Sequence, residues 1–269
     1  MIPTGLQRKL IVAHGKHGTV KRTYWVKPPE QETLHFSSGE RVKARTEGVP
    51  AADRVRISYG MIFSKDANQG IDTALRAIGK VHRVPKDIYT VPVKVTGTLG
   101  GSSGRYEIWR TEIKVSRWAE GPAGVAAHEY GHFLDHRLFG SGQPSFSGMG
   151  TYQRNNKELA PLLTALYKSK AARQIVLQHN KYVDHGNVRG VQAARYLLMP
   201  PEMFARSYAQ WVGLRAGGHV KSDIKLFGDD WREKGRLHAQ WEDADFAPIA
   251  REFDRLFARR GLLNRGRSR

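Results

Sequence analysis

Apolar residues recur at helical spacing along most of the chain after residue 65. Ile71, Leu75, Ile78 and Val81 are three or four positions apart, which predicts a helix that ends before Pro85. The same pattern predicts four later helices: residues 123–139, residues 158–179 with Pro161 in the first turn, a segment from Pro200 to Gly217, and a last helix with Phe246, Ile249, Phe253 and Leu256 on one face. The second half of the chain is therefore expected to be mainly helical.

Strand-like segments occupy the first part of the chain. "LIVAH" and "TVKRTYWVKP" flank "GKHG", which predicts a hairpin with a glycine-containing turn. "RVRISYGMIF", "IYTVPVKVTG" and "RYEIWRTEIKVSR" are further candidate strands, and the loop "TLGGSSG" separates the last two. Strands followed by helices indicate an α+β fold. We predict a basic β-rich extension over residues 1–65, one domain over 66–260 and a basic tail over 261–269.

The charge of the chain is unusual for its size. The sequence holds 44 Lys and Arg against 25 Asp and Glu, a net charge of +19. From Arg259 onward there are five arginines and no acid. Such an excess attracts polyanions: nucleic acid, an anionic membrane or wall, or acidic protein. Contact of the basic surface with a polyanion such as nucleic acid is one interpretation; general solubility or an adaptation of the source organism is the alternative, and the charge alone favours the alternative.

Two absences narrow the class of protein. The chain has no cysteine, which excludes disulfides, thiol catalysis and Cys-ligated zinc. It has no apolar run of roughly 18 residues, so we expect no membrane span. The first apolar stretch of the sequence is too short for a secretory signal. We therefore expect a protein that is made and kept in a cytoplasm, or packed into a particle there.

One short stretch, "AAHEYGHFLDH", carries candidate metal chemistry. It contains His-Glu-x-x-His within the second predicted helix. Residues four apart share a helix face, so His128 and His132 can bind one metal ion. Glu129 is rotated by about 100° and can reach a water on that ion as a general base. Gly131 costs about 1 kcal/mol in a helix relative to alanine, and close approach of a neighbouring strand or ligand side chain is one reason to accept that cost.

A catalytic zinc ion needs a third protein ligand. Asp135 lies on nearly the same helix face, two turns along; we predict that it accepts a histidine N–H and fixes the tautomer, and a solvated helix residue is the alternative. His136 lies too far along a straight helix. Glu202 opens the fourth predicted helix and has suitable chemistry, although a charge that favours the helix dipole is the alternative interpretation. We favour Glu202 as the third ligand.

The two motifs resemble those of a known enzyme class. "HEYGH" with the later "PEMFARSYAQWV" resembles the zincin metallopeptidases whose third ligand is glutamate, the gluzincins. "HEYGHFLDH" is more closely similar to the helix of the anthrax lethal factor-like peptidases and of peptidase-like domains in phage and mobile-element proteins. The resemblance covers about residues 88–214 and is strong in these two motifs. It implies a zincin-like domain with a small mixed sheet, an active-site helix and a helical C-terminal half, with Zn²⁺ bound by His128, His132 and Glu202 and water activated by Glu129.

The resemblance also implies where substrate and oxyanion lie. In the family an extended peptide pairs with an edge strand before the motif helix, and "RYEIWRTEIKV" occupies that place here. Lethal factor-like peptidases place a tyrosine hydroxyl near the oxyanion, a few residues before the ligand glutamate. Tyr196, before Glu202, is one position off that pattern, and a core position is its alternative. The implied function is a zinc metalloendopeptidase of a phage or mobile element, acting on a protein or peptide substrate.

Two other functions fit the same residues. The net charge, the segment "TVKRTYWVKP" and the arginine tail favour a basic protein with a zincin-like domain. It would be a virion or structural component, or would associate with nucleic acid. The intact Glu129 counts against it, because a structural zinc site needs no base. An amidase acting on peptidoglycan would use the same chemistry in a different cleft, but the sequence indicates no sugar-binding surface.

Overall fold

The structure is a computed structural model that describes two units of the chain. It covers residues 7–15, 18–26, 48–58, 64–140, 157–233 and 240–264, with the backbone alone for the first two ranges, for Ser58 and for 228–233. The units are Met1–Ser37 and Ser38–Arg269. In the first, β1 (Gln7–Gly15) and β2 (Gly18–Val26) form the predicted antiparallel hairpin. The proposed boundaries at residues 65 and 260 stay predictions, and residues 265–269 of the tail lie outside the described part.

The second unit contains a small mixed sheet in the order β4-β6-β8-β7. The strands β4 (Val55–Ser58), β6 (Val91–Thr96) and β8 (Glu112–Ser116) are parallel, and β7 (Gly104–Glu107) is antiparallel to β8. A separate antiparallel pair joins β3 (Gly48–Pro50) to β5 (Arg83–Pro85), and the short 3₁₀ helix η1 (Ala51–Arg54) follows β3. Alternate residues of β6, namely Val91, Val93 and Val95, are buried, so one face of the sheet carries the core.

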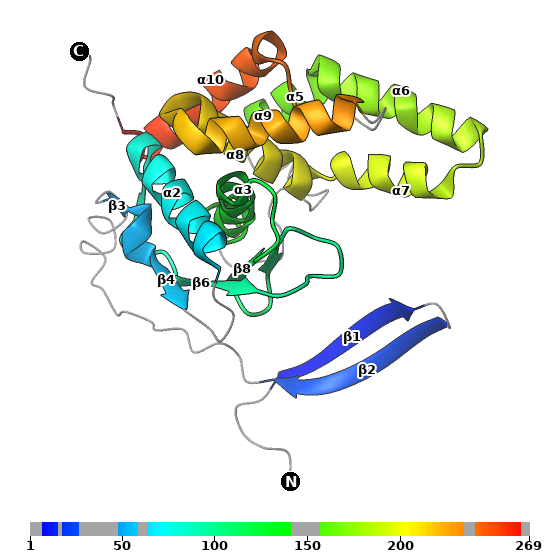
Figure 1. Ribbon diagram of the computed structural model, residues 1–269, viewed down its shortest axis with the longest axis horizontal. Helices are drawn as coiled ribbons and strands as arrows, with labels where there is room; N and C mark the ends of the chain where they lie inside the picture. The colour runs from blue at the N-terminus through cyan, green and yellow to red at the C-terminus, as the bar shows by residue number, and fades with distance from the viewer. Residues whose placement is uncertain are drawn as a thin grey trace. The chain divides into compact units, whose positions relative to one another are not determined.

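Two helices pack together on this sheet. α2 (Lys65–Val81) is the amphipathic helix predicted from its spacing, and the Ser64 hydroxyl caps it by accepting from Ala67 N at 3.4 Å. α3 (Pro122–Leu134) carries the His-Glu-x-x-His motif and packs on α2, β7 and β8 (Figure 1). The helix predicted for residues 123–139 is confirmed as far as Leu134, and its last turn is a π-helix, η2 (Asp135–Phe139). This change of winding begins immediately after the motif.

The remaining helices complete the α+β fold. They are α5 (Ala160–Lys168), α6 (Lys170–Asp184), α7 (Val188–Leu197), α8 (Pro200–Ala216), α9 (Gly218–Glu233) and α10 (Asp243–Arg259). α8 and α10 are the helices predicted from Pro200 and around Phe253. Every residue of α8 from Met203 to Gly213 is buried, so this helix runs through the core.

The single helix predicted for residues 158–179 is wrong, because the chain breaks at Ser169. Its ψ of 153° is extended, and its hydroxyl donates to Leu166 O at 2.7 Å while accepting from Trp241 Nε1 at 2.9 Å. The Asp245 carboxylate accepts from the first two N–H groups of α6, at 2.8 and 2.9 Å. The Ser169 hydroxyl also caps α6 locally by accepting from Ala172 N at 3.2 Å, whereas the contacts from Trp241 and Asp245 come from residues more than seventy positions away.

His82 is a fully buried histidine at the centre of the helical core. Its ring is stacked on Trp211 and lies 4.2 Å from Phe257, centroid to centroid. Nδ1–H donates to Arg83 O at 2.8 Å, and Nε2 accepts from the Tyr208 hydroxyl at 2.7 Å. Burial lowers the pKa of His82 from 6.5 to about 4 despite the backbone hydrogen bond. The ring is therefore neutral in the folded protein at neutral pH.

We expect His82 to make the fold sensitive to acid. Because the folded pKa lies below the unfolded value of 6.5, the unfolded state binds the proton first, and stability falls as the pH drops from about 6.5 to about 4. Between about pH 7 and about pH 5 the loss is about 2 kcal/mol. Urea unfolding of zinc-free wild type and His82→Asn at both pH values checks this. The variant should lose less stability, and equal losses would contradict the assignment.

Candidate metal centre

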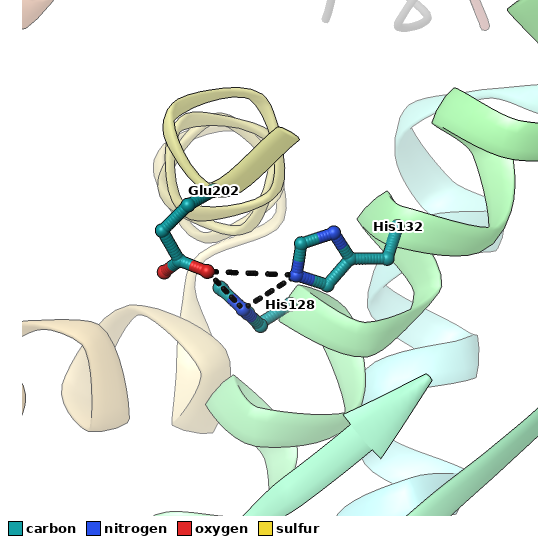
Figure 2. A group of neighbouring side chains, drawn as sticks. All are labelled: His128, His132 and Glu202. Carbon is teal, nitrogen blue, oxygen red and sulfur yellow. Dashed lines mark hydrogen bonds and ion pairs between the residues drawn. The ribbon is translucent and has the colours of Figure 1, made fainter. Parts of the chain in front are cut away.

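Three side chains from two helices converge on one point (Figure 2). His128 and His132 project from α3 one turn apart, with Nε2 atoms 3.1 Å apart and rings at 85° to each other. Glu202, in the first turn of α8, places Oε2 3.6 Å from each of these nitrogens. The structure thus brings together the three residues predicted as metal ligands.

The spacing and burial of these atoms fit a shared metal ion. Ligand atoms about 2.1 Å from a tetrahedral zinc lie about 3.4 Å apart, between the observed 3.1 and 3.6 Å. Glu202 Oε2 is buried and has no hydrogen-bond partner in the described part of the chain. Leaving a buried carboxylate oxygen unsatisfied is costly, so a cation between it and the two imidazoles accounts for the arrangement.

Arg206 holds the other oxygen of Glu202. It lies one turn further along α8, with Nε 3.5 Å from Glu202 Oε1 and Nη2 donating to Leu197 O at 2.6 Å. Burial opposes ionisation, but the two histidines and Arg206 hold the pKa of Glu202 well below its usual range. The carboxylate is therefore charged, as a metal ligand must be. Sequence reasoning did not identify Arg206, although its spacing of four from Glu202 was an available signal.

Glu129 lies beside the ligands and is buried in the same cleft. The backbone N–H of Tyr106, on β7, faces its carboxylate and favours the charged form. Gly104 makes this contact feasible, since a Cβ there would lie 2.7 Å from Glu129 Oε1 and 2.5 Å from Val125 Cγ1. Burial raises the pKa of Glu129 against the opposing effect of the histidines. A raised pKa brings the carboxyl closer to the range of a base that works near neutral pH.

The site opens into a cleft of about 320 Å³ between β7, α3 and the start of α8. Its lining also includes Ser102, Arg105, Ile108, Met199 and Pro201. Tyr196, the candidate oxyanion residue, lies at this cleft with 53% of its surface exposed rather than in the core. Burial of its hydroxyl and the nearby Glu202 carboxylate raise the pKa of Tyr196, so the O–H is retained.

Two residues that follow the motif also line the cleft. Asp135 is buried there, and its proposed hydrogen bond from a metal-binding histidine stays a prediction. His136, expected to lie too far along a straight helix, is buried at the cleft within η2. Its Nδ1 forms a 2.7 Å hydrogen bond with the Tyr106 hydroxyl. His136 does not belong to the group of converging ligand atoms.

Gly131 sets the distance between the two helices that carry the three candidate ligands. A Cβ at this position would lie 2.9 Å from Ala205 Cα and 3.1 Å from Tyr208 Cδ1, both on α8. The sequence suggested close approach of a strand or a ligand side chain; the structure shows instead a contact of α3 with α8, the helix that carries Glu202. Because Ala205 contributes backbone, the contact cannot be relieved by a side-chain rotation.

We expect Gly131→Ala to push α3 and α8 apart. Overpacking of this kind costs about 1–3 kcal/mol, which exceeds the gain of about 1 kcal/mol in helix propensity, and zinc affinity should fall at least about tenfold as the ligands separate. Gly79→Ala on α2 is the matched control, because nothing lies within 4 Å of its added Cβ. Urea unfolding and competitive zinc titration check both variants; similar behaviour of the two would refute the spacer role.

Comparison with protein-family models, with curated proteins and with solved structures found no match to this chain. In the part of the chain that the structure describes, no helix has both the length and the apolar character that crossing a bilayer demands.

Proposed function

We propose that this chain is a zinc-dependent metallopeptidase of the gluzincin type, with a zincin-like domain, that hydrolyses peptide bonds. The observation that carries the proposal is the buried Glu202 Oε2, which accepts no hydrogen bond in the described part of the chain and lies 3.6 Å from His128 Nε2 and His132 Nε2, with the buried Glu129 beside them. A structural zinc site uses four protein ligands, whereas a catalytic site uses three and leaves a position open. Two imidazoles and one carboxylate are a ligand set found in catalytic zinc sites.

The residues of the site have distinct tasks in such a reaction. Zinc, when bound, supplies Lewis acidity that polarises a carbonyl and lowers the pKa of water. Glu129 accepts a proton from the attacking water and then donates it to the leaving amine. Tyr196, which keeps its O–H, donates a hydrogen bond to the oxygen on which negative charge develops. Arg206 keeps Glu202 ionised and oriented.

The edge strand β7 gives an extended peptide a partner. Ser103 O accepts from Ser116 N at 2.8 Å, so the alternation of an antiparallel strand turns the backbone groups of Gly104 and Tyr106 to the opposite edge. That is the edge at which Tyr106 N–H meets Glu129, and both residues line the cleft. A peptide that pairs there brings its backbone to the acid–base group.

A search for zinc-dependent cleavage tests the proposal. Zinc-loaded protein is incubated with a peptide mixture from a cell digest, and new termini are identified by mass spectrometry. Cleavage should stop with a zinc chelator, return on addition of Zn²⁺, and be missing in His132→Ala, which removes one ligand. No new termini with zinc-replete wild type, or the same termini with His132→Ala, would overturn the proposal.

The charge-based alternative, a basic virion or nucleic-acid-associated protein, stays a prediction. The side chains of "TVKRTYWVKP" and residues 265–269, on which it partly depends, lie outside the described side chains. The phage or mobile-element origin and the cellular location are likewise untested predictions. The buried Glu129 favours hydrolysis, because a structural metal site needs no acid–base group. A peptidoglycan amidase would differ from a peptidase in substrate, and the cleavage assay separates the two.

A further inference from the structure

Next to the cleft, α6 and α7 form a helical hairpin in which the two helices lie side by side (Figure 1). Ile175, Ala194 and Leu197 form its own small buried cluster, separate from the main core. The outer faces of both helices are exposed along most of their length. The hairpin therefore presents a large surface that the described part of the chain leaves open to solvent.

This outer surface is strongly basic. Residues 170–197 contain five Lys and Arg but one acid, Asp184. Lys170 forms an exposed ion pair with Glu242 at 3.7 Å. The other four cations, Arg173, Lys181, Arg189 and Arg195, are exposed, and no carboxylate among the described residues pairs with them. Four unpaired cations on one hairpin favour an acidic partner.

Aliphatic side chains are interspersed with these cations. Val176, Leu177, Val183 and Val188 are 45, 62, 52 and 66% exposed. Leu177 lies one turn from both Arg173 and Lys181, so these three residues form one row along α6. Exposed aliphatic groups that lie among the cations allow a bound partner to make apolar contacts as well as ionic ones.

The surface is continuous with the metal cleft through α7. Tyr196, which lines the cleft, shares a helix face with Gln192 and Arg189, four and seven positions earlier, and both are exposed. Arg189 therefore lies about 10 Å along the helix from Tyr196. Arg105, on β7, adds a further exposed cation to the lining of the cleft. A chain that leaves the cleft over Tyr196 meets cations and aliphatic groups in turn.

We infer that the outer face of the α6–α7 hairpin docks an acidic segment of the protein substrate that also carries apolar residues. The inference rests on the proposed function, since it identifies the class of substrate that the same cleft cleaves. Charge complementarity and continuity with the cleft point to this partner. Nucleic acid would pair with the cations but leave the aliphatic groups without contacts. A membrane surface is disfavoured because a membrane-bound helix has one broad apolar face, whereas the aliphatic groups of α6 are dispersed around the helix.

Binding of designed peptides to Glu129→Gln protein loaded with zinc tests the docking surface without turnover. The probe is a fluorescent peptide of alternating Glu and Leu, compared with a Gln and Leu peptide and a Glu and Ala peptide. Arg189→Glu with Lys181→Glu should weaken binding of the first probe at least about tenfold, and Leu177→Ser about threefold. Arg251→Glu, which reverses one exposed cation on α10, is the matched charge control for Arg189→Glu alone and should change affinity less than about twofold, against at least about threefold for Arg189→Glu.

Each outcome decides the inference. Strong binding of the Glu and Leu peptide, with losses confined to the hairpin variants, supports it. No binding, an equal loss in Arg251→Glu, or tighter hairpin-dependent binding of duplex DNA than of the peptide overturns it. Hydrolysis by wild type of the Gln and Leu peptide is measured in parallel. If zinc-dependent hydrolysis fails while hairpin-dependent binding persists, the peptidase proposal is wrong and the docking surface stands. If hydrolysis occurs but peptide binding does not depend on the hairpin, only the docking surface is refuted.

Discussion

Glu129→Gln is expected to bind zinc as the wild type does and to lose peptide hydrolysis by about 10³-fold. The amide keeps the shape of the carboxyl, and its oxygen can still face the Tyr106 N–H as the Glu129 carboxylate does. It cannot take a proton from water or return one to the leaving amine, a contribution worth about 10²–10⁴-fold in general acid–base catalysis. Zinc content and kcat, measured on a peptide found in the cleavage search, check the two expectations together.

The control for this variant changes the same chemical group elsewhere. Glu242→Gln removes an exposed carboxylate that pairs with Lys170, outside the lining of the metal cleft. It should leave kcat and zinc content at their wild-type values. Near-normal hydrolysis by Glu129→Gln would show that another group activates the water, and loss of zinc from that variant would show that Glu129 is itself a ligand.

Glu202→Ala should have the second large effect, on metal affinity. Loss of a residue that only hydrogen-bonds a metal ligand lowers metal affinity by about 10–100-fold. Deletion of the third ligand itself should therefore weaken zinc binding by more than about 100-fold. Competitive titration against a coloured chelator measures this. Glu158→Ala, which breaks the ion pair with Arg260 away from the cleft, is the control. Unchanged affinity in Glu202→Ala would direct attention to Asp135 or His136 as the missing ligand.

The parts of the site that lie within one helix were predictable from the sequence. His128 and His132 are four positions apart, and helix geometry alone places them on one face. Glu202, seventy positions later, was selected by its chemistry, its place at a helix start and the family resemblance. Its meeting with the histidines depends on the packing of α3 against α8 at Gly131. The glycine was the local sign of that contact, but the sequence did not identify the contacting element.

Other features depended on tertiary contacts that no local pattern records. The positions of Gly104 and Tyr106 at the acid–base group follow from the register of β7 on β8 and the approach of α3. The break at Ser169 is stabilised by Trp241 and Asp245 from the far end of the chain. Helix periodicity continues through the break, so pattern reasoning merged α5 with α6. The π-helical turn after Leu134 was not predicted either, because the helix periodicity continues through it as well.

The most direct test of the central claim is zinc X-ray absorption spectroscopy on wild-type protein purified without chelators. We predict one zinc per chain, with nitrogen and oxygen ligands at about 2.0–2.1 Å, two of them imidazoles. Such a result would match the donor set of His128, His132 and Glu202, and its loss in Glu202→Ala would assign the ion to these residues. Protein that takes up no zinc even when it is supplied, or a centre with three or more imidazoles, would contradict the proposed site and the peptidase function built on it.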